Sequence, residues 1–234
     1  MEHIGQGGNW DIYRFENTLK TKHFVFRIPK FNSESKIENY LYNYSLIKKL
    51  KLPTLNTAIK YSKNRENGIK TEDLNYLNDW IYVSHNSLYS DSLKQIHQLS
   101  NSILKNENQK KNRKSPEIEE YRYRNRLSEI LNFNLFLEDC IQDLIRTTEN
   151  DILIEYDSYF FGSSRNEKKS DIDYKIVDLD NIFDKTEKKS DELFELNLSE
   201  FTRAITGFVN YFIDKNEQDK YLNLIEKNYA QHRI

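Results

Sequence analysis

The sequence predicts an α+β protein in which a small β-rich part precedes a mainly helical part. Up to about residue 74, the chain consists mostly of β-rich runs behind a glycine-rich N-terminus, with one helical run between them. From about residue 91, apolar residues recur every three or four positions, which is the spacing of an amphipathic helix. A chain of 234 residues is long enough for two lobes that meet at a cleft. We therefore expect a small lobe at residues 1–74 and a helical lobe at residues 75–234.

The chain is expected to begin with a glycine-rich β-hairpin. Residues 10–15 (WDIYRF) and 23–31 (HFVFRIPKF) are β-rich runs, and a polar turn at residues 17–22 would join them. Three of the six glycines precede the first run: Gly5, Gly7 and Gly8.

A helix and two or three strands complete the small lobe. The helix is predicted from about residue 34 to residue 50, where apolar residues recur at helical spacing, and Pro53 would end it. Residues 57–64 and 69–74 predict two strands around a turn, and residues 79–84 are a candidate third.

The rest of the chain is predicted to be helical apart from one hairpin. Helical spacing appears at residues 91–103 and 117–146, and again from residue 192. Residues 152–162 and 173–178 are β-rich and predict the two strands of the hairpin.

The composition limits the class of protein. With 31% charged residues and no apolar stretch of the length that a membrane helix needs, we expect a soluble chain without a membrane span. A formal charge of -2 argues against a general nucleic-acid binder. Cys140 is the only cysteine, which excludes an internal disulfide and fits a reducing compartment, either the cytoplasm or a host cytoplasm into which the protein is delivered. The composition leaves the oligomeric state open.

The acidic stretch at residues 161–180, FGSSRNEKKSDIDYKIVDLD, fits two metal-dependent chemistries. In one, the hydrophobic run that ends at Asp178 places a carboxylate where a magnesium ion bridging two phosphates needs an oxygen ligand. Asp180 would be a second ligand or would orient the first.

In the other, FGSS followed by SDID is similar to the nucleotidyltransferase signature. That resemblance implies that Gly162 and Ser163 hold the phosphates and that Asp171 and Asp173 bind the metal. It also requires a third carboxylate on a later strand, and beyond Asp180 the chain offers only residues 208–214 as a weak strand candidate.

The N-terminal part resembles the protein-kinase-like superfamily. Glycines on a hairpin let backbone N–H groups approach phosphate oxygens, and here the run is GQGGNWDIY. Kinases add a cation on the next strand and a glutamate on the following helix. The matching residues here are Arg27, with Lys30 just after it, and Glu34 or Glu38. The resemblance thus implies an ATP site that includes Gly5, Gly7, Gly8, Arg27, Lys30 and Glu38.

The string FVFRIPK narrows the resemblance. An arginine in place of the strand lysine resembles choline kinases and inositol-pentakisphosphate 2-kinases, which implies that Arg27 clamps the nucleotide phosphates, with Lys30 as second choice. Residues 71–75 fall where the hinge between kinase lobes binds adenine, so Glu72 and Leu74 join the expected ATP site.

The catalytic acid has two candidates. IEYD matches the kinase catalytic triplet with Asp157 as the acid, but Gly162 stands where the asparagine of that motif is expected. RTTENDILI resembles the inositol-pentakisphosphate 2-kinase segment in which Asp151 is the acid, or Glu149 after a shift of the alignment. The β-rich composition after residue 151 favours Asp151.

The expected activity is transfer of the γ-phosphate of ATP, with Mg²⁺, to a hydroxyl of a small polyol or phosphorylated polyol, possible acceptors including an inositol phosphate. The basic residues that bind substrate phosphates in the inositol kinases are not matched by NIFDK, except at Lys185. Three alternatives stay open: a protein kinase of effector type, a nucleotidyltransferase, and a pseudokinase or binding module.

Overall fold

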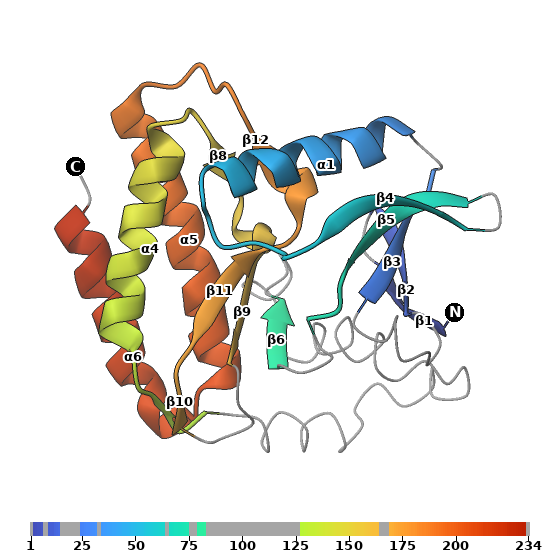
Figure 1. Cartoon of the computed structure of the whole chain (residues 1–234). Coiled ribbons are helices and arrows are strands. Elements are labelled where there is room, and N and C mark those ends of the chain that lie inside the picture. The colour runs from blue at the N-terminus through green and yellow to red at the C-terminus, as the bar shows by residue number, and fades with distance from the viewer. Residues whose placement is uncertain are drawn as a thin grey trace.

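The computed structural model describes residues 2–6, 9–14, 24–31, 34–63, 66–74, 79–82, 127–163 and 169–232. Within these ranges, a five-stranded antiparallel sheet with one long helix lies on one side, and three long helices lie on the other (Figure 1). A short β-hairpin lies between the two groups (Figure 1). The predicted α+β class is therefore confirmed.

The five-stranded sheet is formed by the N-terminal strands. Its order is β1-β2-β3-β5-β4, and every neighbouring pair is antiparallel. The pairing of residues 10–14 with 24–29, and of 58–63 with 66–72, confirms the predicted hairpins, whereas the strand that contains Gly5 is an additional one. The strands are β1 (Glu2–Gln6), β2 (Trp10–Arg14), β3 (Phe24–Pro29), β4 (Ala58–Lys63) and β5 (Glu66–Glu72).

Gly68 lies where β5 passes close to β3. A Cβ at Gly68 would lie 2.3 Å from the carbonyl oxygen of Arg27 and 2.7 Å from the ring of Phe26. Any side chain there would push the two strands apart, since real Cβ atoms do not approach backbone so closely. The glycine thus fixes the backbone that carries Arg27, which pairs with Ile12 on β2 and Ile69 on β5.

The helix α1 (Glu34–Lys49) packs against β4 and β5. It begins with an acidic residue, Glu34, and ends with two basic residues, a charge distribution that favours the helix dipole. Its buried face carries Ile37, Tyr40, Asn43 and Ile47. Two of these four are polar, which shows that this face meets more than an apolar core.

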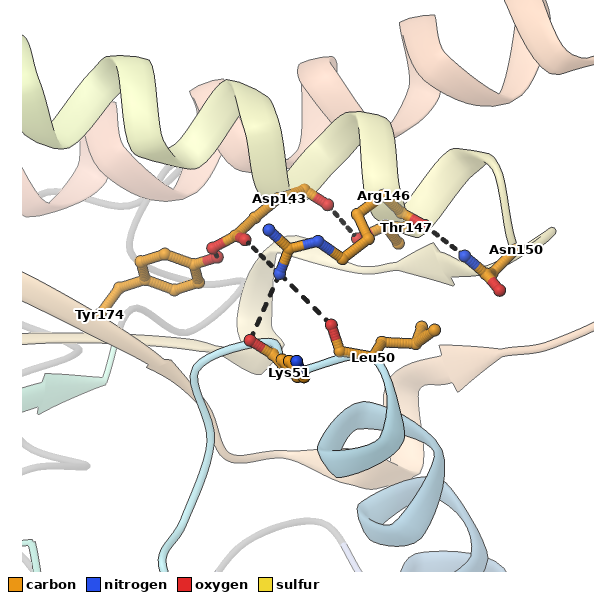
Figure 2. A network of polar contacts seen from close by, with 7 residues as sticks. All are labelled: Leu50, Lys51, Asp143, Arg146, Thr147, Asn150 and Tyr174. Carbon is orange, nitrogen blue, oxygen red and sulfur yellow. Dashed lines mark hydrogen bonds and ion pairs between the residues drawn. The ribbon is translucent and has the colours of Figure 1, made fainter.

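The end of α1 is joined to the helix α4 (Phe133–Thr148) by one arginine (Figure 2). The guanidinium of Arg146 donates to the backbone oxygens of Leu50 and Lys51, both at 3.3 Å, and lies 3.2 Å from Oδ1 of Asp143. The other oxygen of Asp143 accepts from the hydroxyl of Tyr174 at 2.7 Å. Tyr174 lies on β11 (Asp173–Ile176), so a single network connects α1, α4 and the central hairpin.

The helix predicted over residues 117–146 starts later than expected within the described residues. Residues 129–130 form a short strand, β7 (Glu129–Ile130), which pairs with β10 (Lys169–Ser170), and α4 begins only at Phe133. Asn132 explains the late start, because its amide donates to the carbonyl of Ile172 and accepts from its N–H. The spacing of apolar residues could not reveal that the side chain of Asn132 binds the backbone of Ile172.

The strand predicted over residues 152–162 is interrupted by a 3₁₀ turn, η3 (Tyr156–Ser158). Before the turn, β8 (Leu153–Ile154) pairs with β12 (Ile182–Phe183). After it, β9 (Tyr159–Ser163) lies between β11 and β6 (Asp79–Tyr82) in a separate three-stranded sheet. The candidate third strand of the small lobe therefore pairs with the central hairpin.

The helical tail is confirmed but contains a break. α5 (Ser190–Phe212) and α6 (Lys215–His232) are separated where Leu127 inserts: its N–H donates to the carbonyl of Phe212, and its carbonyl accepts from the N–H of Asp214. The helix predicted at residues 91–103 lies outside the described residues. Of the helices that the structure describes, none is both long and apolar enough to cross a membrane.

Asn197 on α5 is expected to be essential for stability, because it is fully buried and hydrogen-bonds to backbone groups at and just before β8. Its amide donates to the carbonyl of Ile152 at 2.8 Å and accepts from the N–H of Ile154 at 3.1 Å. Asn197→Leu would leave both buried groups without partners, at a cost of about 2–4 kcal/mol in the free energy of unfolding, measured by urea denaturation.

The matched control is Asn150→Ala, which removes an exposed amide that donates to the carbonyl of Arg146. Water replaces that donor, so we expect a change below about 1 kcal/mol. Equal effects of the two substitutions would contradict the role given to Asn197.

Candidate active site

Two carboxylates mark the turn that follows β11. Asp178 comes two residues after the strand, and Asp180 lies in the 3₁₀ turn η4 (Leu179–Asn181). Loss of surrounding water and the negative charge of Asp180 raise the pKa of the Asp178 carboxyl to about 7. The positive charge of Arg27 opposes the rise, and the negative charge of Asp157 adds to it.

The polar residues on the buried face of α1 hold this turn. The hydroxyl of Tyr40 donates to the carbonyl of Val177 at 3.0 Å, and the amide of Asn43 donates to the carbonyl of Leu179 at 2.7 Å. Both side chains are buried. The helix thus fixes the backbone on either side of Asp178, which explains why its inner face is not purely apolar.

A second segment, the turn η3, is bound to the same backbone. Ser158 accepts at its carbonyl from the N–H of Val177 at 2.8 Å, and its hydroxyl donates to the carbonyl of Asp178 at 2.9 Å. Next to it, Asp157 accepts at Oδ1 from the amide of Asn181 at 3.0 Å. The interruption of the predicted strand therefore brings the carboxylate of Asp157 to the Asp178 turn.

The N-terminal hairpin reaches the turn through β2. The indole N–H of Trp10 donates to Oδ2 of Asp180 at 2.5 Å, and the amide of Asn9 lies 3.4 Å from the same oxygen. Lys36 donates to the other end of that amide at 2.8 Å. Sequence reasoning missed Trp10 and Asn9 as site residues, although both stand in the run GQGGNWDIY.

Arg27 lies on β3 with its guanidinium carbon 5.7 Å from the ring centre of Tyr40 and its Nε 3.4 Å from the hydroxyl of Thr71. Its positive charge lowers the pKa of Asp178. Among the described residues it forms no ion pair with Glu34 or Glu38: Glu34 pairs with Lys60, and Glu38 is exposed. The contact between α1 and Arg27 is therefore made by the ring of Tyr40 and not by a glutamate.

The segment expected to bind adenine is fastened by two ion pairs. Glu72 lies 2.8 Å from Nζ of Lys175 on β11, and Asp73 lies 2.6 Å from Nε of Arg14 on β2. The side chain of Glu72 is thus committed to joining β5 and β11, while Leu74 stands half-buried in the turn that follows.

The remaining expected residues lie at different places. Lys30 is exposed, and its N–H donates to the carbonyl of Asn9. Asp151 is exposed in the turn between α4 and β8, with a φ of 56°, and its carbonyl accepts from the N–H of Thr186. Gly5 lies within β1, and both Gly7 and Gly8 fall outside the described residues.

Three residues of the nucleotidyltransferase interpretation, Gly162, Ser163 and Asp173, lie in the central hairpin, and Asp171 lies between β10 and β11. Gly162 pairs with Trp80 on one side and with Asp173 on the other, so it occupies the middle of a sheet and not a phosphate-binding turn. Residues 208–212, the weak candidate for a later strand, belong to α5. Beyond Asp180, the two-residue β12 is the only strand in the part of the chain that the structure describes.

The carboxylates fit a magnesium ion that brings further ligands with it. Mg²⁺ takes oxygen ligands and is often held by one or two carboxylates together with substrate phosphates and water. Asp178 and Asp180 could supply the two carboxylates. In the described part of the chain, no group of three or more His, Cys, Asp or Glu side chains is arranged to hold a metal on its own.

Comparisons with known proteins add little to this geometry. No family model matches the sequence. No curated protein matches it either. Among solved structures, the chain is similar to the protein in the complex of gentamicin with APH(2")-IIa, with 13% sequence identity and a TM-score of 0.29. The alignment covers 98% of this chain and 90% of the APH(2")-IIa chain. At this TM-score the likeness shows neither a shared fold nor a shared activity.

Trp10→Phe is expected to destabilise the protein by about 1.5–3 kcal/mol, because it removes a donor to a carboxylate in a part-buried setting. Urea unfolding would measure the loss. Tyr42→Phe is the matched control, since its hydroxyl donates to a carboxylate, Asp184, at 2.6 Å but from an exposed side chain. A loss at Trp10 no larger than that at Tyr42 would contradict the importance of the contact with Asp180.

Asp178→Asn is expected to stabilise the protein at high pH only. The pKa of Asp178 is about 7 in the folded protein and about 3.9 in an unfolded chain. Between about pH 4 and pH 7, the carboxyl is therefore protonated in the folded state and ionised in the unfolded state. Wild-type stability therefore falls as pH rises from about 4 to 7. The substitution should gain about 2–4 kcal/mol at pH 8 and little at pH 4, measured by urea unfolding in EDTA. An equal gain at both pH values would refute the raised pKa.

Proposed function

We propose that this protein is an ATP-dependent phosphotransferase that moves the γ-phosphate to a hydroxyl group of a small acceptor. The observation that carries the proposal is the convergence of segments distant in the chain on the turn that holds Asp178 and Asp180. Trp10 of the glycine-containing hairpin contacts Asp180, and Asp157 is hydrogen-bonded to Asn181 in the same turn. The positive charge of Arg27 lowers the pKa of Asp178. A cation, an expected metal-binding pair and an expected acid are the parts that phosphoryl transfer requires close together.

Each residue then has a separate task. Asp178 and Asp180 would hold the Mg²⁺ that neutralises charge on the nucleotide phosphates. Arg27 would bind phosphate oxygens, and its anchoring over Tyr40 and against Thr71 limits its movement. Asp157 would accept the proton of the acceptor hydroxyl, as a positioned carboxylate does in general base catalysis. We prefer Asp157 to Asp151 because it contacts the Asp178 turn through Asn181.

The two-lobed organisation belongs to this proposal. Residues 1–74 would form the small lobe and residues 75–234 the helical lobe, with ATP bound between them beside Leu74. The acceptor would be a small polyol or phosphorylated polyol, including an inositol phosphate, and a protein acceptor is the next choice.

A catalytically inactive binding protein is the second candidate, and one observation favours it. The asparagine expected five residues after Asp157 is Gly162, which is buried in the middle of β9 and offers no side chain to a second metal ion. Thermal stabilisation by Mg-ATP without turnover of ATP would support this candidate.

The test of the reaction class uses ATP labelled at either the γ or the α phosphate, with Mg²⁺ and a panel of inositol phosphates, sugars, lysate proteins and RNA. We expect transfer of the γ label to a small acceptor. Transfer of the α label with release of pyrophosphate would replace the proposal by nucleotidyl transfer. In that case Asp171→Ala, and not Asp178→Ala, would abolish activity.

The identity of the catalytic acid is tested by two substitutions in the γ-transfer assay. Asp157→Ala should lower kcat by about 10²- to 10⁴-fold, the usual contribution of a positioned base. Asp151→Asn, which tolerates the positive φ at that position, should leave kcat within about threefold. The reverse pattern would restore Asp151 as the acid.

A further inference from the structure

We infer that Asn181 is a positioning residue that fixes the carboxylate of Asp157; this inference rests on the proposed function. Nδ2 of Asn181 lies 3.0 Å from Oδ1 of Asp157. Since an ionised carboxylate only accepts hydrogen bonds, the amide nitrogen is the end of Asn181 that must face it. Both side chains are half-buried, where such a charge-assisted bond is stronger than in water.

The backbone around both residues is already fixed, so the amide controls only the side chain of Asp157. The N–H of Glu155 donates to the carbonyl of Asn181 at 3.2 Å, and the N–H of Tyr156 donates to Glu200 at 3.0 Å. Ser158 binds the carbonyl of Asp178 from the other side. None of these bonds uses the amide of Asn181. Replacing that amide should therefore leave the two turns in place.

Asn181 lies at a different place from the asparagine that the kinase motif expects at Gly162. Gly162 is hydrogen-bonded between two strands, whereas Asn181 directly follows the metal-binding pair and faces the acid. The structure thus places an amide beside Asp157 from the segment after β11 and not from the segment after the acid.

Asn181→Leu keeps the size of the side chain and removes the donor, and Asn181→Asp keeps an oxygen but also removes the donor. In the γ-transfer assay, both should lower kcat by about 10- to 100-fold, the effect typical of residues that orient an acting side chain through a hydrogen bond. The KM for Mg-ATP should change less than about threefold. In an Asp157→Ala background, Asn181→Leu should have no further effect on kcat, since Asn181 acts through Asp157.

Asn132→Leu is the structural control, because it removes another part-buried amide, at the opposite end of β11, with two hydrogen bonds to Ile172. It should lower the Tm and leave kcat unchanged. A readout independent of turnover is the ¹H–¹⁵N spectrum: the side-chain NH₂ pair of Asn181, assigned by its loss in Asn181→Leu, should shift when Asp157 is replaced by Ala.

Two kinetic results would overturn the inference and leave the proposed function standing. One is wild-type kcat in Asn181→Leu, and the other is an Asn181→Asp variant that keeps activity and tightens the Mg²⁺ dependence, which would make Asn181 a metal ligand. If wild-type protein transfers no γ label, the proposed function fails and this inference fails with it. If the NH₂ signal does not respond to Asp157→Ala, Asn181 and Asp157 are not hydrogen-bonded in solution, and the inference fails on that ground as well.

Discussion

The rest of the structure depends on how the chain holds the five residues from Val177 to Asn181. Two carboxylates in a desolvated turn repel each other, and burial of Asp178 costs free energy that the surroundings must offset. The backbone of the turn is therefore bound from two sides, by Tyr40 and Asn43 of α1 and by Ser158 of η3. The polar face of α1, the interruption of the predicted strand and the contact from β2 all follow from this one requirement.

This arrangement is the one expected if the turn carries the proposed active site. An acid kept near its pKa at neutral pH lowers the stability of the folded state, and proteins retain such groups where chemistry needs them. The network of Arg146, Asp143 and Tyr174 differs in its partners. Burial raises the pKa of Asp143 as well, but there an ion pair and a hydroxyl donor oppose the rise, and the carboxylate connects three elements. At Asp178 a second carboxylate, Asp180, adds to the rise.

Much of the fold could be predicted from local patterns, but the arrangement of the site could not. Alternating and helical spacing identified the pairs β2 with β3 and β4 with β5, the helix α1, and the strand that leads to Asp178. The errors came from contacts distant in sequence: Asn132 binds Ile172 and delays the start of α4, and η3 interrupts a β-rich run and binds the carbonyl of Asp178. For the same reason the indole of Trp10, 170 residues from its partner, gave no signal in the sequence.

The distance between Trp10 and Asp180 along the chain also bears on how the molecule is made. The five-stranded sheet uses only residues 2–72, so it can form early while the ribosome is still synthesising the rest. Its contact with Asp180 must wait until that residue has left the exit tunnel, and closing so long a loop is slow compared with local pairing. Until then the nascent chain would expose the face of α1 that carries Tyr40 and Asn43, which makes this face one that chaperones would have to protect during synthesis.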